Sequence, residues 1–170
     1  MTPDEIIDQL AENAKLFETL LKTVDEDHSK WKLNDNKWSI LEIVCHLRDE
    51  EIEDFRTRVR CTLNDPGTTP PAIDPESWPK DRKYIEQSFE SVVASFLRER
   101  EGSVLWLHTI NGADWDQGWE HPRLGLQTAR HYLENWLAHD YLHLRQIIRV
   151  KYDYLEARKG SNLSYAGKWV

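Results

Sequence analysis

Apolar residues recur every three or four positions along four long segments of the chain, which is the spacing of amphipathic α-helices. The segments are residues 3–24, 40–63, 81–110 and 128–155. Two of these helices have a clear start signal, because Thr2 with Glu5 and Ser39 with Glu42 have the spacing of a capping box. Gly102 costs roughly 1 kcal/mol relative to alanine inside a helix, so the third helix can break or kink there.

Two long connections link these helices. Residues 64–80 hold five of the seven prolines and can reach roughly 56 Å when extended, which is enough to carry the chain back along a whole bundle. Residues 111–127 form a second loop, and loops of this length are usually functional or mobile. Four amphipathic helices in 170 residues predict one all-α domain, a four-helix bundle over residues 1–157, followed by a tail of residues 158–170.

The charge, the apolar runs and the cysteines of the chain indicate which partners and which location to expect. A net charge of −8 argues against a nucleic-acid or membrane-surface partner, since both attract proteins through clusters of Lys and Arg. No apolar run approaches the roughly 20 residues that span a bilayer, and the N-terminus lacks the pattern of a secretory signal. On one helix Cys45 and Cys61 would lie roughly 24 Å apart, too far for a disulfide. We therefore expect a cytoplasmic protein.

Three of the seven histidines are candidate metal ligands. His139 and His143 are four residues apart on the apolar stripe of the last helix, so their imidazoles point from one face into the core. His46 can meet this pair if the second and fourth helices are neighbours. Three histidine ligands leave a transition metal an open position for water or substrate. The alternative is that all three are core histidines, each satisfied by a hydrogen bond.

Four further residues are candidates for other parts of the site. Glu50 lies one turn beyond His46 and could act as a base, orient a ligand or bind a cationic substrate. Asp140 flanks the histidine pair and could hold an imidazole in one tautomer, although a surface carboxylate fits the sequence equally well. Trp115 and Trp119, in the second long loop, are candidates for the rim of a pocket.

The order of these motifs resembles that of the DinB-like (YfiT-like) superfamily over residues 1–155. The similar features are Trp38-Ser39-Ile40-Leu41-Glu42-x-x-x-His46-Leu47, then Glu50, the His121-Pro122…Gly125 stretch, the His139-x-x-x-His143 pair and Gln146. The resemblance implies an up-down-down-up four-helix bundle, often a homodimer, with a divalent metal held by His46, His139 and His143. Imidazole ligands suit zinc, nickel, copper or iron, and we expect zinc or nickel, with iron as the alternative.

Members of this superfamily are described as metal-dependent hydrolases, and some relatives transfer low-molecular-weight thiols such as bacillithiol or use mycothiol in an isomerisation. The resemblance therefore implies an enzyme that activates water or a thiol cosubstrate for attack on a small molecule. Two alternatives stay open. One is a non-catalytic module in which the metal stabilises the bundle or helps to bind a ligand, and the other is a metal-free structural bundle.

Overall fold

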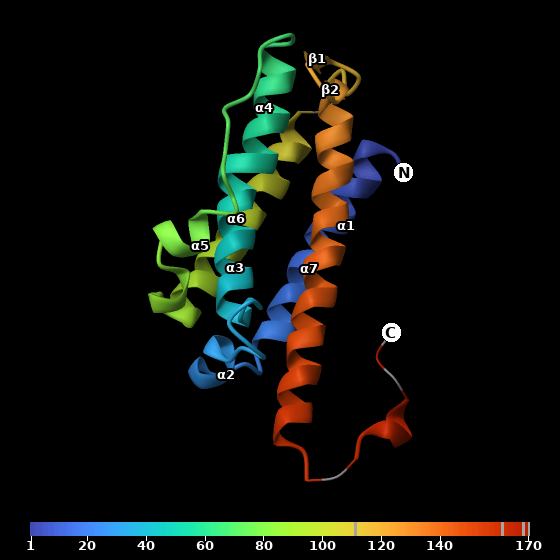
Figure 1. The fold of residues 1–170 in the computed structure, drawn as a ribbon. Helices are drawn as coiled ribbons and strands as arrows, with labels where there is room; N and C mark the ends of the chain where they lie inside the picture. The colour runs from blue at the N-terminus through green and yellow to red at the C-terminus, as the bar shows by residue number, and fades with distance from the viewer. Residues whose placement is uncertain (111, 161, 168, 170) are drawn as a thin grey trace.

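Four long helical segments form a bundle (Figure 1). The computed structural model describes residues 1–110, 112–160, 162–167 and 169. The first segment is α1 (Pro3–Leu21), and the second consists of α3 (Ile40–Asp49), a turn of π-helix, η1 (Glu50–Phe55), and α4 (Arg56–Asn64). The third segment is α6 (Phe89–Thr109), and the fourth is α7 (Ala129–Arg158).

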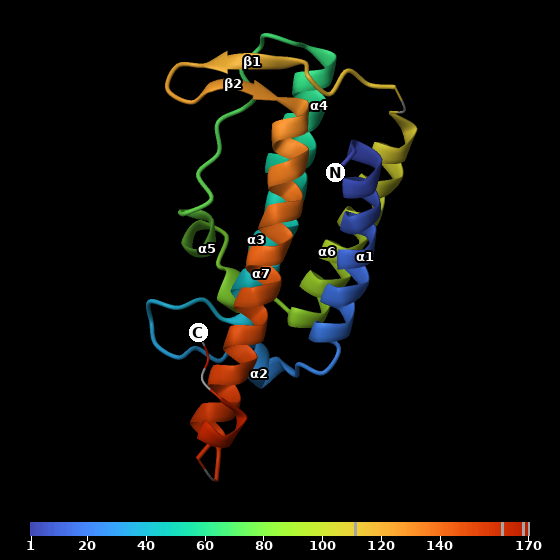
Figure 2. The ribbon, with the colours of Figure 1, turned by 90° about the vertical axis from the view of Figure 1, so that its right-hand side faces the viewer.

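The helices run up-down-down-up. Figures 1 and 2 show α1 and α7 running in one direction while α3–α4 and α6 run in the other. Helix α1 packs between α6 and α7, while α3 packs on α6 and α4 on α7, so the four segments close into a ring. Residues 65–77 return along the outside of the bundle, which lets the second and third segments run parallel (Figure 1). The expected four-helix bundle is confirmed.

Both expected capping boxes are present. The Thr2 hydroxyl accepts from the Glu5 backbone N–H at 3.2 Å, and the Glu5 carboxylate accepts from the Thr2 backbone N–H at 2.7 Å. Ser39 and Glu42 make the same exchange at 3.2 and 2.8 Å. Such reciprocal bonds satisfy backbone donors that have no partner in the first turn of a helix. The Ser39 box therefore fixes the start of α3, two turns before His46.

A buried polar layer crosses the bundle, and its centre is Arg100 on α6. Its guanidinium donates two hydrogen bonds of 2.7 Å to Asp140 on α7 and one of 2.9 Å to Glu51 in η1. Asn13 on α1 donates to Asp140 at 3.1 Å, and the Trp136 indole donates to Glu51 at 3.0 Å. Each of these five side chains is at most 1% exposed. A buried charge is stable only when it is paired in this way, so the layer fixes the four segments relative to one another.

The buried polar layer separates two apolar clusters, and it does so on every bundle segment. In order from one cluster to the other, the residues are Leu10, Asn13 and Phe17 on α1; Phe55, Glu51 and Leu47 on the second segment; Leu107, Arg100 and Phe96 on α6; and Leu137, Asp140 and Leu144 on α7. The polar groups thus meet at one level of the bundle. This level fixes the axial register between the second segment and α7, which carry the candidate ligands.

The π-helical turn η1 interrupts the second segment, where the sequence predicted a regular helix. The Thr57 hydroxyl donates at 2.7 Å to the carbonyl of Ile52, five residues earlier, and so satisfies a backbone acceptor beside the widened turn. Glu50 and Glu51 are both buried at this turn. Glu51 enters the buried polar layer while Glu50 lies on the side of His46.

The third bundle helix begins later than the sequence predicted. Residues 81–88 contain the end of a short helix, α5 (Trp78–Asp81), and a single turn, η2 (Tyr84–Glu86), before α6 starts at Phe89. Lys83 has a left-handed backbone with φ 49°, which ends any continuous helix through this stretch. Gly102 causes no break, because packing of α6 on both neighbouring segments outweighs its low helix propensity.

The chain is mostly helical, as expected, but residues 112–127, where the sequence predicted a loop, are not a simple loop. They contain β1 (Gly118–His121), which pairs with β2 (Gly125–Thr128) in an antiparallel hairpin (Figure 2). A Cβ at Gly118 would lie 2.7 Å from the Gln127 carbonyl, so only glycine fits there. A short helix, α2 (Glu26–Lys30), was also missed, and the tail contains one turn, η3 (Ser164–Ala166).

Within the described part of the chain, no helix is long and apolar enough to cross a membrane.

Replacing Arg100 tests whether the buried polar layer stabilises the bundle. Arg100→Ala leaves Glu51 and Asp140 buried without their cation, and we expect a loss of about 3–5 kcal/mol in the free energy of unfolding, measured by urea denaturation. The control Arg98→Ala removes an exposed arginine of the same helix and should change stability by less than about 0.5 kcal/mol. Equal losses in the two variants would contradict this role.

Candidate metal centre

Three imidazoles converge between α3 and α7. The Nε2 atom of His139 lies 3.3 Å from Nε2 of His46 and 3.0 Å from Nε2 of His143. One ring nitrogen from each of the three residues lies within 4.8 Å of the other two. His46 and His143 are buried, and His139 is partly exposed. The structure therefore brings together the three histidines that the sequence selected, from segments about 90 residues apart.

The backbone explains why these rings meet. His139 and His143 are one turn apart on α7, so their rings lie one above the other. The buried polar layer sets the level of both helices, since Asp140 follows His139 and Glu51 lies just over one turn beyond His46. Phe55 packs against the His139 ring with centroids 5.0 Å apart. The site is thus held by the same contacts that hold the bundle.

All three imidazoles are neutral near pH 7. Burial lowers the pKa of His46 to about 3 and that of His139 to about 2, and the nearby His143 adds to both shifts. Burial also lowers the pKa of His143. A neutral imidazole keeps a lone pair on one ring nitrogen, and this is the form that binds a metal.

The spacing of the three nitrogens fits one metal ion. Zinc–imidazole bonds of about 2.0–2.1 Å place two ligand nitrogens about 3.4 Å apart in a tetrahedral site and about 3 Å apart in an octahedral one. The two separations from Nε2 of His139, 3.0 and 3.3 Å, lie close to that range, and the ligand nitrogens of His46 and His143 lie within 4.8 Å of each other. The three residues therefore fit a divalent transition metal, and three protein ligands would leave coordination positions open.

The second ring nitrogen, Nδ1, which we call the outer nitrogen, has different surroundings in His143 and in His46. Nδ1 of His143 lies 2.8 Å from the Gln146 amide oxygen, and since that oxygen only accepts, Nδ1 carries the proton and Nε2 keeps its lone pair. Nδ1 of His46 is buried without a hydrogen-bond partner among the described residues, and Oε1 of Glu50 lies 3.9 Å from it. Trp38 packs edge-on against the His46 ring, with centroids 5.0 Å apart.

Glu50 is buried next to His46. Burial, reinforced by the charge of Asp54, raises its pKa to about 8. Its Oε1 atom lies 3.9 Å from Nδ1 of His46, which is a close approach but beyond hydrogen-bond distance. This position suits a residue that orients an imidazole.

Asp140 lies elsewhere than either sequence interpretation expected. It is fully buried, so the prediction that it is a surface carboxylate is wrong. Its two oxygens accept hydrogen bonds from Arg100 and Asn13 and not from an imidazole. Because both oxygens are already bonded in the buried polar layer, Asp140 is poorly placed to act as a base. It fixes α7 through Arg100.

The two tryptophans of the second loop lie near the N-terminal end of α7, where the hairpin joins the helix. Trp119 is buried, donates to the Tyr132 hydroxyl at 3.0 Å and lines a cavity of about 590 Å³ with residues of the 69–73 segment. Trp115 packs against the apolar cluster that contains Leu133 and is not part of that lining. Neither residue contacts the three histidines in the structure.

Sequence reasoning passed over two residues that touch the histidines. Trp38 was interpreted as a helix-start residue and Gln146 only as part of the family pattern. The available signal was spacing, because Gln146 lies three residues after His143 on the same helix face. The approach of Phe55 to His139 depends on the π-helical turn, which the apolar periodicity does not reveal.

The fold and the site define a helical-bundle protein with a buried cluster of three histidines. Residues 9–147 match the DinB superfamily, so the chain belongs to that superfamily. The chain is also similar to the solved structure of YfiT from Bacillus subtilis, described as a probable metal-dependent hydrolase with an unusual four-helix bundle topology. The match has a TM-score of 0.78 and 16% identity and covers 89% of this chain and 87% of YfiT, so it shows a shared fold. Comparison with curated proteins gives no match.

Gln146 is expected to support metal binding through His143. Gln146→Leu removes the acceptor that holds Nδ1–H of His143, and we expect the dissociation constant for Zn²⁺, measured by competition with a chromogenic chelator, to rise about 10–100-fold. Gln146→Glu keeps an acceptor and should bind Zn²⁺ about as tightly as the original chain. Unchanged affinity in Gln146→Leu would show that this hydrogen bond has no such role.

Proposed function

We propose that this protein is a divalent-metal-dependent enzyme, of the hydrolase or thiol-transferase type, whose metal is held by His46, His139 and His143. The observation that carries this proposal is the convergence of three neutral imidazole nitrogens at 3.0 and 3.3 Å. Zinc or nickel suits this set of ligands, with iron as the alternative. The description of YfiT as a probable metal-dependent hydrolase supports the same class. The free thiols of Cys45 and Cys61 are consistent with a cytoplasmic location.

The side chains around the centre have distinct roles in this proposal. His46, His139 and His143 would hold the divalent metal, which would supply Lewis acidity that lowers the pKa of a bound water or thiol. Gln146 holds His143 in the tautomer that presents Nε2. Glu50 is a positioning residue that faces the outer nitrogen of His46. Trp38 and Phe55 pack against His46 and His139 and limit the access of water to the rings.

Metal analysis tests the ligand set. Protein purified without a nickel column should contain stoichiometric divalent metal, and His46→Ala or His143→Ala should lose it because two ligands remain. Circular dichroism should show a retained fold, since the apolar clusters and the buried polar layer are untouched. The control His131→Ala removes an exposed histidine from α7 and should keep the metal. Absence of metal from the original chain, with unchanged metal affinity in the variants, would contradict the proposal, and complete unfolding would indicate a structural metal.

A screen of small electrophiles with and without thiols tests the reaction. We expect turnover by the metal-loaded protein and loss of at least about 100-fold in kcat/KM in His143→Ala, because this variant no longer holds the metal. Activity that requires a thiol supports transfer, and activity with water alone supports hydrolysis. A metal-loaded protein that turns over no substrate in either screen would favour the non-catalytic binding module.

A further inference from the structure

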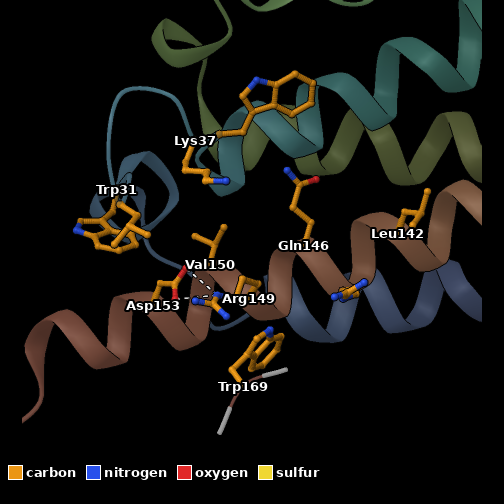
Figure 3. A pocket seen from close by; sticks show the side chains of 11 residues that line it. Trp31, Lys37, Leu142, Gln146, Arg149, Val150, Asp153 and Trp169 are labelled. Atoms are coloured by element: carbon orange, nitrogen blue, oxygen red, sulfur yellow. Dashed lines mark hydrogen bonds and ion pairs between the residues drawn. The ribbon is translucent and has the colours of Figure 1, made fainter.

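A cavity of about 490 Å³ (Figure 3) is lined in part by Trp38 and Gln146, which contact the three-histidine cluster. It is enclosed by the loop before α3, by the second half of α7 and by the tail residue Trp169. The volume falls within the roughly 300–1,000 Å³ of cavities that hold small ligands. We call it the tryptophan cavity, because Trp31, Trp38 and Trp169 line it.

Two residues that line the tryptophan cavity also contact the histidine cluster. Gln146 lines the cavity, and its amide oxygen lies 2.8 Å from Nδ1 of His143. Trp38 also lines the cavity, and its ring packs on the other side against His46. A molecule in the cavity is therefore separated from two of the imidazoles by a single side chain. The cavity is well placed for the non-reacting part of a substrate.

The charges around the cavity are unusual for this chain. Three cationic side chains line it, although the net charge of the protein is −8. Arg149 is neutralised by Asp153 at 2.9 Å. Among the residues that the structure describes, neither Lys37 nor Arg145 has a carboxylate within 4.0 Å. Figure 3 shows Lys37 extending from the loop into the space that Gln146 enters from α7.

Cations and indoles together indicate the chemistry of a ligand. Cations without a protein partner attract an anion, and apolar aromatic walls favour a flat or apolar body, so the combination suits a small molecule with an acidic group at one end. We propose, building on the proposed function, that the tryptophan cavity binds the anionic end of an amphipathic small-molecule substrate or cosubstrate. Lys37 and Arg145 hold the acidic group while the indoles cover the apolar part. The reacting end then lies toward His46 and His143.

A matched pair of probes tests this inference. The probes are 2-naphthylacetate and its neutral isostere 2-naphthylacetamide, and binding is measured by calorimetry on chelator-treated, metal-free protein whose fold is checked by circular dichroism. We expect the acetate to bind about tenfold more tightly than the amide, because only the acetate pairs with the cations. Lys37→Gln and Arg145→Gln should each weaken acetate binding about three- to tenfold and leave amide binding unchanged. The control Lys15→Gln, on α1, should change neither.

Several results would overturn the assignment. Equal affinity for both probes, no binding of either, or acetate binding that ignores both substitutions would each reject an anion site in this cavity. Acetate binding that appears only after Zn²⁺ is restored and does not depend on Lys37 or Arg145 would also reject it, since the metal would then be the binding group. The metal content is measured separately. If the protein binds no metal but still distinguishes the two probes through Lys37, the anion site in the cavity is supported and only the proposed function is rejected.

Discussion

The buried guanidinium of Arg100 is the constraint on which the rest of the structure depends. It has no access to water, so the fold is stable only in the arrangement that brings Asp140 and Glu51 to it. Asp140 belongs to α7, and Glu51 belongs to the π-helical turn that continues α3. Helix α7 carries His139 and His143, and α3 carries His46. A shift of either segment along its axis would leave a charge unpaired. The pairing that stabilises the bundle therefore also fixes the relative level of His46 and His139.

The sequence predicts the fold and the set of histidines well because both depend on local residue patterns. The one further assumption is that the second and fourth helices are neighbours. Periodic apolar residues and two capping boxes define the helices, and a four-residue spacing pairs His139 with His143. The buried polar layer was not predicted, because its contacts join residues 40–127 positions apart. A signal was nevertheless present, since Asn13 and Arg100 stand at positions where the apolar stripes of α1 and α6 would place a core residue. The π-helical turn and the hairpin depend on backbone hydrogen bonds that the apolar periodicity does not encode.

The corrections to the sequence interpretation have a common physical cause, which is burial. Asp140 was weighed as a surface or tautomer-fixing carboxylate, and burial beside Arg100 gives it a structural role instead. Trp115 and Trp119 were expected at a pocket rim, and Trp119 does line a cavity with residues of the 69–73 segment, whereas Trp115 packs against an apolar cluster. The tryptophans that line the cavity next to Gln146 are those of the segment before α3 and of the tail. They frame a cationic cavity in an acidic protein, which links the unusual tryptophan content to the candidate site.

The central claim is that three imidazoles, preorganised by the bundle, coordinate one divalent metal and leave a position open. X-ray absorption spectroscopy of the protein loaded with one equivalent of Zn²⁺ tests it most directly. The account predicts three imidazole nitrogens at about 2.0–2.1 Å, with the outer-ring scattering typical of histidine, and a remaining light-atom ligand that is replaced by sulfur when a small thiol is added. A spectrum without imidazole scattering, or with a fourth protein ligand that no added molecule displaces, would contradict it.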